Sequence, residues 1–489
     1  MRKVIDLQME FWKKDIADIE LDFQSRDEIP KLLYGLQHIY RTKPIRDKVF
    51  GILKDIVPRK SQETGRPGMD LWKILVLGTL RLNCNFDYDK VQEMANNHHK
   101  VRMMLGHAET DFDSQYALQT IKDNLPLLSC DVLDQINQVV VEAGHSIVSP
   151  KKAPPLRGSC DSFVVETDVH YPTDANLLFD AMRKMISLIA IFCSELELTE
   201  WRQSHHNIMK VKGLLRQIQS LKRSTSKDEA KKAERDRFIV AAHQDYVNIC
   251  QGFISRTEQT ILILRDMFTF SATQNMRLID IEEYIVHARR QIDQITRRVM
   301  LDEKIPHEEK VFSIFEPHTE WISKGKAGIR QELGLSVCIL KDQYGFILHH
   351  RVLEQESDAK IAVEMVQGAK DRFATFIGCS FDKGFYSRDN REKLMQLLDS
   401  VVLPKKGRLS VADRDIEGSE EFRSHRRKHS AVESSINALE NHGLDRCRDH
   451  GINGFKRYVA LSVVARNIQI LGHLIQQKEL KREMRRRAA

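Results

Sequence analysis

The spacing of apolar residues changes twice along this chain of 489 residues, and this change constrains the fold most strongly. Runs typical of β-strands end at Asp168 and begin again near residue 335. Residues 177–305 between them show helical spacing, with charged residues separating the apolar ones. The clearest stripe consists of Ile281, Ile285, Ala288, Ile292, Ile295 and Val299. A sheet interrupted in this way must accommodate a long insertion of paired helices.

The second half of the chain alternates strand and helix patterns. Two strand patterns, 335–342 and 345–352, are separated by only two residues, which predicts a hairpin. A helix, a strand ending at Asp382, a helix, a short strand and two closing helices follow. This order predicts a mixed α/β sheet with helices on its faces.

Residues 1–150 carry only helical patterns. We expect helices over 71–82, 89–95, 101–106, 116–124 and 130–144. Short helices joined by tight turns fit either a helix-turn-helix bundle on DNA or a helical domain without a nucleic-acid role, and periodicity does not separate the two. Arg66, between Gly65 and Pro67, is compatible with a minor-groove contact or with a plain loop before a helix. A Pro-rich, basic linker over 151–159 ends this part.

Composition excludes some classes of protein and leaves others open. The net charge of +7 permits a polyanionic partner without requiring one. The eight cysteines form no Cys-x-x-Cys pair, which argues against structural zinc and fits reduced thiols. No signal-peptide core follows the N-terminus, and the longest apolar stretch, near 185–193, is too short to span a bilayer. We expect a soluble cytoplasmic protein with no membrane partner.

Three acidic residues stand in contexts that suit metal-dependent chemistry. Asp168 and Asp382 each end an apolar run, and Glu433 lies in a helical stretch beside Val432 and Ile436. Two carboxylates at strand ends and a third on a helix can converge on a pair of divalent cations. Such a pair polarises a phosphodiester and activates water or a 3′-hydroxyl.

Each of these acids has an alternative explanation or a competitor. An Asp at a strand end is often a turn or cap residue, and Glu433 is also compatible with an exposed helix position. Asp161 and Asp174 compete with Asp168 for the first position. Asp161 precedes the apolar run and Asp174 follows Pro172, so we expect Asp168 to be the better candidate.

Basic residues cluster beside the second and third acids. They are Lys405, Lys406, Arg408, Arg426, Arg427 and Lys428. A charge run is commonly a solvated face, but beside a phosphodiester site it is expected to follow the DNA backbone. The basic tail over 478–489 is either a phosphate-binding segment or a disordered end.

Taken together, the contexts of Asp168, Asp382 and Glu433 resemble the Asp-Asp-Glu signature of bacterial insertion-sequence transposases. The chain as a whole resembles the subgroup labelled ISNCY. The stretch from Gly65 to Gly106 is also similar to the N-terminal domain of such transposases. The resemblance covers roughly residues 60–145, 160–176 and 335–475.

The resemblance implies a ribonuclease-H-like catalytic domain built from residues 160–176 and 306–477. A helical insertion over 177–305 would interrupt it, and an all-α, DNA-binding domain over 1–150 would precede it. Asp168, Asp382 and Glu433 would hold two Mg²⁺ or Mn²⁺ ions. The enzyme would act on double-stranded DNA in the bacterial nucleoid, as a homodimer or higher oligomer. It would cleave at terminal inverted repeats and join the freed 3′-ends to target DNA.

The resemblance has one clear limit. Related transposases carry a Tyr-Arg-Glu-Lys motif around the catalytic Glu, but here the Tyr, Arg and Lys positions hold Arg426, His429 and Glu440. The resemblance therefore does not extend to a hairpin DNA intermediate. Two other functions stay open: a ribonuclease-H-fold nuclease that cuts without joining, and a catalytically inactive DNA-binding protein derived from a transposase.

Overall fold

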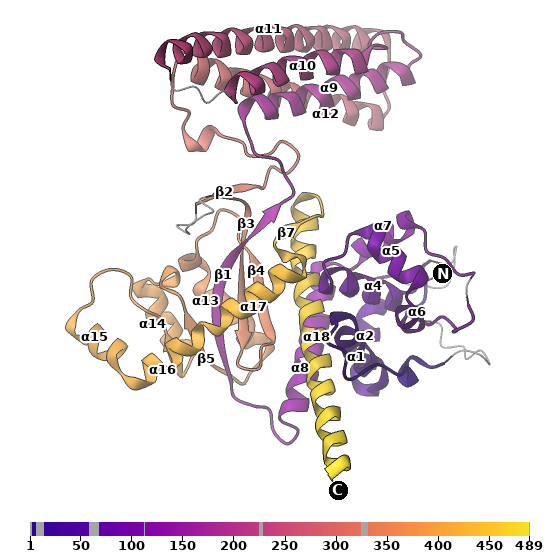
Figure 1. Cartoon of the computed structure of the whole chain (residues 1–489), viewed down its shortest axis with the longest axis vertical. Helices are drawn as coiled ribbons and strands as arrows, with labels where there is room; N and C mark the ends of the chain where they lie inside the picture. The colour runs from indigo at the N-terminus through magenta and orange to yellow at the C-terminus, as the bar shows by residue number, and fades with distance from the viewer. Residues whose placement is uncertain are drawn as a thin grey trace. The chain divides into compact units, whose positions relative to one another are not determined.

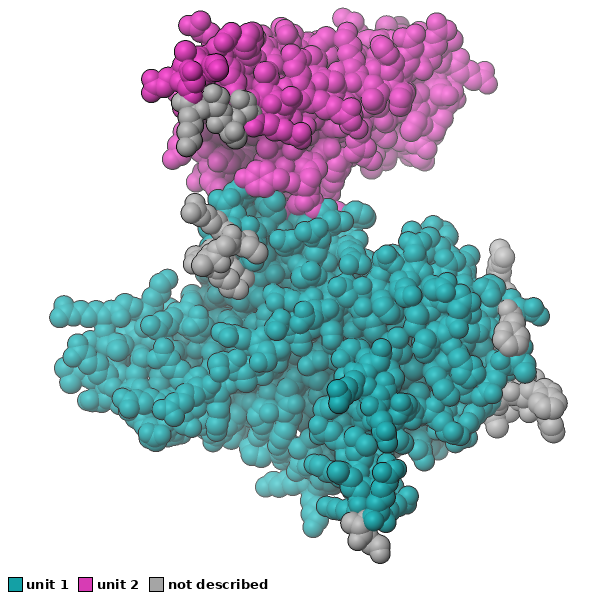
Figure 2. Space-filling model, viewed as in Figure 1, with its two compact units in different colours: residues 1–168, 320–489 teal, residues 169–319 magenta. Residues whose placement is uncertain are grey.

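The structure, a computed structural model, describes residues 2–5, 14–57, 68–111, 113–223, 228–323 and 331–488. The chain divides into two compact units (Figure 2). Unit 1 comprises Met1–Asp168 and Glu320–Ala489, and unit 2 comprises Val169–Thr319. Each unit has its own cluster of buried apolar side chains, so each is described separately.

Unit 1 contains a mixed sheet of seven strands in the part of the chain that the structure describes. The strands are β1 (Leu156–Thr167), β2 (Glu320–Ile322), β3 (Glu332–Asp342), β4 (Ile347–Val352), β5 (Phe376–Phe381), β6 (Ser400–Val402) and β7 (Arg446–Cys447). The main order is β2-β3-β1-β5-β6, with β4 paired to β3 and β7 to β1. β3 runs antiparallel to β1 and β4, whereas β5 runs parallel to β1 and β6. The predicted mixed α/β sheet and the hairpin of β3 and β4 are confirmed.

The central strand β1 is longer than the sequence predicts. Residues 156–159, which we assigned to the basic linker, lie inside the strand. They form part of the strand because β3 and β5 pair with them on either side. Gly158, for example, stands opposite Asp342 on β3 and Cys379 on β5. The linker prediction is therefore wrong for these residues, and Asp161 lies within β1 rather than before it.

Helices cover the sheet. Those that follow β4 in sequence are α13 (Asp358–Arg372), α14 (Arg388–Leu397), α15 (Val411–Gly418), α16 (Glu420–His429), α17 (Ala431–Leu439) and α18 (Gly451–Ala488). α16 contacts β5 and β6, and α17 contacts β1 and crosses the sheet (Figure 1). The face of the sheet beneath α16 and α17 carries the candidate site.

The N-terminal helices belong to the same unit as the sheet. They are α1 (Glu28–Arg41), α2 (Lys43–Asp55), α4 (Leu71–Asn83), α5 (Tyr88–Asn97), α6 (His99–Met104), α7 (Leu118–Asn124) and α8 (Cys130–Val148). The five helices predicted between residues 71 and 144 are thus confirmed. Their apolar faces share one core with the sheet, so residues 1–150 do not form a separate compact unit.

The long helix α18 links these parts of unit 1. It packs against α1, α4 and α8, and Gly35 and Gly472 lie where α1 and α18 cross so closely that a Cβ at either would overlap the other helix. By length and composition alone, its stretch Gly451–Arg487 would be able to cross a membrane, but 72% of its apolar window is buried inside the protein. The basic tail over 478–488 continues this helix.

Unit 2 is a bundle of four main helices among the residues described. They are α9 (Asp174–Glu195), α10 (Ser204–Lys222), α11 (Glu229–Met267) and α12 (Ala272–Ile295). α9 packs against α10 and α12, and α10 packs against α11. The predicted stripe on α12 is buried from Ile281 to Ile295, which confirms the paired helices and shows that they pair with one another within one chain.

Candidate carboxylate site

Strand register brings Asp161 beside Asp382. In the parallel pair of β1 and β5, Cys160 stands opposite Phe381, and each is followed by an aspartate: Asp161 within β1 and Asp382 directly after the end of β5. Two residues earlier, the hydroxyl oxygens of Ser159 and Ser380 lie 2.9 Å apart. Because side chains alternate between the two faces of a strand, Asp161 shares the face of this serine pair.

Glu433 reaches the same face from α17. Lys341, which stands opposite Ser159 on β3, donates from Nζ to the carbonyl oxygen of Ala431 at 2.5 Å and to Ser435 Oγ at 3.2 Å. These bonds hold the first turn of α17 against the sheet. Val432 and Ile436 are buried, as predicted for the packed side of this helix, whereas Glu433 itself is exposed, as in the alternative interpretation of this position.

The electrostatics of Asp161 show that the acids converge. The pKa of Asp161 is raised to about 6: burial is the largest cause, the N–H of Ser162 opposes it, and the negative charges of Asp382, Asp358 and Glu433 add to it. A carboxylate that is both partly desolvated and surrounded by like charges prefers to be protonated. A cation placed among these groups would relieve that cost.

Asp168 lies elsewhere. It follows the last residue of β1, its side chain is 58% exposed, and its carboxylate is 3.8 Å from Arg446 Nη1. Seven residues of extended strand separate it from Asp161, a span of about 23 Å. Seven is also an odd number, so a regular strand would direct the two side chains to opposite faces. Of the aspartates on or next to β1, Asp161 rather than Asp168 therefore lies near Asp382 and Glu433.

A histidine completes the surroundings of the acids. His429, the last residue of α16, lies 3.0 Å from Ser380 Oγ through Nδ1. Its Nε2 is buried and has no hydrogen-bond partner among the residues described. Burial lowers the pKa of His429, and the nearby Asp382 and Glu433 oppose this shift. A neutral imidazole with an unused nitrogen thus stands next to the carboxylates.

The donor set suits a hard divalent cation. Asp161, Asp382 and Glu433 offer only carboxylate oxygens, the ligands that Mg²⁺ and Mn²⁺ prefer. Within the described ranges, no three His, Cys, Asp or Glu side chains stand close enough to enclose one ion. Carboxylates that repel one another are expected to draw together when a cation neutralises them.

The predicted basic residues fall into two groups. Lys405 Nζ binds Asp413 at 2.5 Å, and Arg426 lies 3.9 Å from Glu417, so acids already engage both. The remainder are exposed: Lys406, Arg408, Arg427 and Lys428. Arg66 lies outside the described residues.

Comparison with known proteins adds no assignment. No family model, no curated protein and no solved structure matches this chain.

Proposed function

We propose that this protein is a metal-dependent transposase of the Asp-Asp-Glu type, with Asp161, Asp382 and Glu433 as its three acids. The observation that carries the proposal is the register of β1 and β5, which sets Asp161 beside Asp382 under the helix that bears Glu433. The resemblance of the sequences around Asp382 and Glu433 to insertion-sequence transposases supports the same reading.

The topology of the sheet supports a ribonuclease-H-like catalytic domain. β1, β3 and β4 form an antiparallel meander, and β5 and β6 extend it with strands parallel to β1. The acids then come from the central strand, from the end of its parallel neighbour and from a helix after the last of these strands. Unit 2 interrupts this order between β1 and β2, as an insertion after the first catalytic strand would.

Each residue has a distinct task in this proposal. Asp161 and Asp382 present oxygens from adjacent strands, whose pairing fixes their spacing, and Glu433 adds a third from α17. Two bound Mg²⁺ or Mn²⁺ ions would supply the polarisation of the phosphodiester and the activation of water or a 3′-hydroxyl. The Ser380–His429 contact holds the neutral imidazole beside the acids.

The direct test uses DNA that contains the sequences flanking the gene, where imperfect inverted repeats are expected. Asp161→Asn, Asp382→Asn and Glu433→Gln should each abolish Mg²⁺-dependent cleavage and spare binding to the ends. Asp168→Asn is the matched control and should cleave normally. Cleavage retained in any of the first three variants would remove that residue from the site.

A strand-transfer assay separates transposition from simple nuclease activity. The wild-type protein is given pre-cleaved ends and a target plasmid, and joined products are counted. Joining supports the transposase, whereas release of ends without joining favours a nuclease. An absence of both reactions, with end binding intact, favours an inactive DNA-binding derivative.

Unit 2 is our candidate for self-assembly on two element ends. Its helices α11 and α12 keep large apolar side chains exposed, namely Phe238, Leu262, Ile263, Met267, Met276 and Val286. A contiguous exposed apolar patch favours a protein contact, and Ile263 and Met267, four residues apart on α11, share one helix face. Replacing Leu262, Ile263 and Met267 with Ser should yield monomers by light scattering, and a variant that stays dimeric would contradict this role.

A further inference from the structure

A second feature lies on the same face of the sheet as the carboxylates. It is a pocket of about 550 Å³ formed by the start of β1, the end of β3, β5, β6 and the end of α16. Its lining includes Pro155, Arg157, Tyr344, Val402, His425 and Lys428. We call it the basic pocket.

The basic pocket carries an excess of positive charge. Arg157, Lys341 and Lys428 line it, and Asp342 is its one acidic lining residue. The carboxylate of Asp342 is already engaged, by His145 Nε2 at 2.6 Å and by the N–H groups of Tyr344 and Phe346, each at 2.9 Å. Three cations and one acid give the lining residues a net charge of +2.

The histidine of the basic pocket does not change this net charge. Arg157 Nη1 donates to His425 Nε2 at 2.9 Å, which requires this nitrogen to be unprotonated. Burial, and then the charges of Arg157 and Lys428, lower the pKa of His425. The ring is therefore neutral and holds the guanidinium in place, so the positive excess persists.

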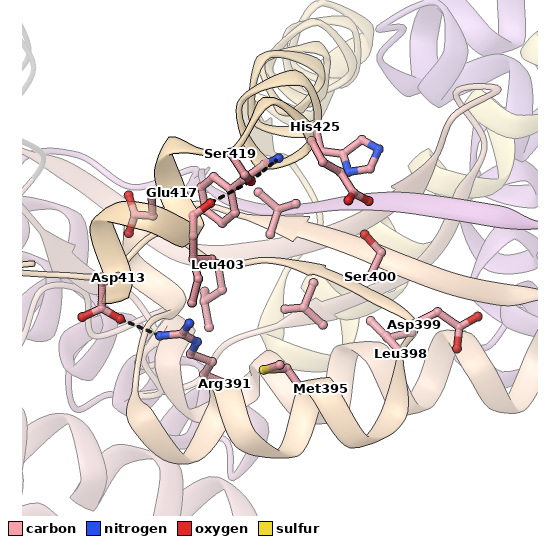
Figure 3. A pocket seen from close by; sticks show the side chains of 15 residues that line it. Arg391, Met395, Leu398, Asp399, Ser400, Leu403, Asp413, Glu417, Ser419 and His425 are labelled. Carbon is pink, nitrogen blue, oxygen red and sulfur yellow. Dashed lines mark hydrogen bonds and ion pairs between the residues drawn. The ribbon is translucent and has the colours of Figure 1, made fainter. Parts of the chain in front are cut away.

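A neighbouring pocket shows that this excess is not general in the region. That pocket, of about 350 Å³, lies between α14, β6 and α15–α16 (Figure 3). Its Arg391 is 2.8 Å from Asp413, and Glu417 and Glu421 also line it. Its cation is matched by acids, so an anion is expected to prefer the basic pocket.

The position of the basic pocket relates it to the carboxylates. Ser159 and Ser380 line the pocket, and they lie one side-chain repeat, about 7 Å, before Asp161 and Asp382. An occupant of the basic pocket would thus lie within a nucleotide or two of a phosphodiester at the acids. Apolar surface from Pro155, Val402 and Tyr344 offers contacts that a bare inorganic anion would not use.

We propose that the basic pocket binds one nucleotide of a DNA strand, with its phosphate on Arg157 and Lys428 and its sugar and base against Pro155, Val402 and Tyr344. The proposal rests on the proposed function for the identity of the strand. It does not depend on a metal or on cleavage.

The test measures binding by calorimetry with the full-length protein in EDTA. The probes are inorganic phosphate, deoxyadenosine, dAMP and a short 5′-phosphorylated single strand. Wild-type protein should bind dAMP and the strand more tightly than phosphate or the nucleoside. Arg157→Gln with Lys428→Gln should weaken both by about 10- to 100-fold, because each loses a charge-assisted hydrogen bond.

The matched control removes the same charge from α14. Arg388→Gln with Lys393→Gln alters two exposed cations outside the basic pocket, and it should bind dAMP as the wild type does. Arg157→Lys with Lys428→Arg should restore most of the affinity. Equal losses in the pocket and control variants would overturn the proposal, since the effect would then be general electrostatics.

Two further outcomes would also overturn it. Phosphate that binds as tightly as dAMP would mean a simple anion site, and no binding of any probe at millimolar concentration would mean no site.

Asp161→Asn with Asp382→Asn should keep dAMP affinity. If the wild type binds dAMP through Arg157 and Lys428 but never cleaves DNA, the pocket stands and the catalytic proposal fails.

Discussion

The middle of strand β1 and the position just past its end differ sharply, although each presents an aspartate. Asp161 lies mid-strand, opposite Ile339 on β3, with a pKa raised to about 6 by burial and by neighbouring acids. Asp168 lies just past the strand, exposed, near Arg446. The sequence around Asp168 resembles a catalytic context more than the sequence around Asp161 does. The position of each aspartate in the sheet nevertheless decides which of them lies near the other acids.

The largest expected difference between these two aspartates is in catalysis. Asp161→Asn should reduce Mg²⁺-dependent DNA cleavage by at least about 10³-fold, because a neutral amide cannot replace a carboxylate ligand. Asp168→Asn should stay within about threefold of wild type, since nothing couples it to the other acids. Cleavage rates on DNA from the flanks of the gene measure both. The reverse result would restore Asp168 to the site.

The next difference is in stability without metal. Folding raises the pKa of Asp161 from 3.8 to about 6, so the folded state binds this proton more readily than the unfolded state. The raised pKa therefore lowers the free energy of unfolding. This loss is absent below about pH 4 and complete above about pH 6. In EDTA at pH 8, Asp161→Asn should raise the free energy of unfolding by up to about 3 kcal/mol.

Urea titrations at pH 4 and pH 8 measure this loss. The advantage of Asp161→Asn over wild type should disappear at the lower pH, where the wild-type carboxyl is already protonated. Asp168→Asn should change the free energy of unfolding by less than about 0.5 kcal/mol at either pH. An advantage that does not vary with pH would contradict the assigned charge environment.

A smaller difference between Asp161 and Asp168 is expected in how much a bound divalent cation stabilises their variants. At a Mn²⁺ concentration ten times the dissociation constant, binding should stabilise the wild-type protein by about 1.4 kcal/mol. Differential scanning calorimetry should show this as a higher melting temperature in wild type and in Asp168→Asn. The shift should be absent in Asp161→Asn and in Asp382→Asn, and a normal shift in either would argue against their role as ligands.

The smallest effect is expected at Arg446. Its guanidinium pairs with Glu166 at 2.9 Å and with Asp168 at 3.8 Å, and all three side chains are substantially exposed. Exposed ion pairs stabilise proteins by less than about 1 kcal/mol and weaken in salt. Arg446→Gln should therefore lower the free energy of unfolding only slightly, and molar NaCl should abolish the difference. A loss above 2 kcal/mol would show that this end of β1 is a tighter site than its exposure indicates.

Local patterns were sufficient to predict the helices. The apolar stripe from Ile281 to Ile295 is buried as its spacing requires, and the helices of residues 71–144 begin and end close to their predicted limits. Helical spacing reports contacts between residues three or four apart, so a single segment contains the whole signal.

The position of Asp161 within β1 could not be predicted in the same way. Arg157, Gly158 and Ser159 have weak strand preference and follow a Pro-rich segment, so the start of β1 is hidden. The strand forms there because β3 and β5 pair with it, and both come from far along the chain. A strand extended back to Leu156 would have placed Asp161 at its centre, and it would also have brought Arg157 out of the linker and into the basic pocket.

The insertion of unit 2 directly after β1 has a consequence for biosynthesis. The ribosome completes the central strand before any of its sheet partners exists, and it must then translate the entire helical bundle before β2 and β3 emerge. The bundle pairs helices close in sequence, so it can form co-translationally, while the nascent β1 keeps both hydrogen-bonding edges unpaired. We therefore expect the unpaired β1 to be the segment of the nascent polypeptide that most requires chaperone binding.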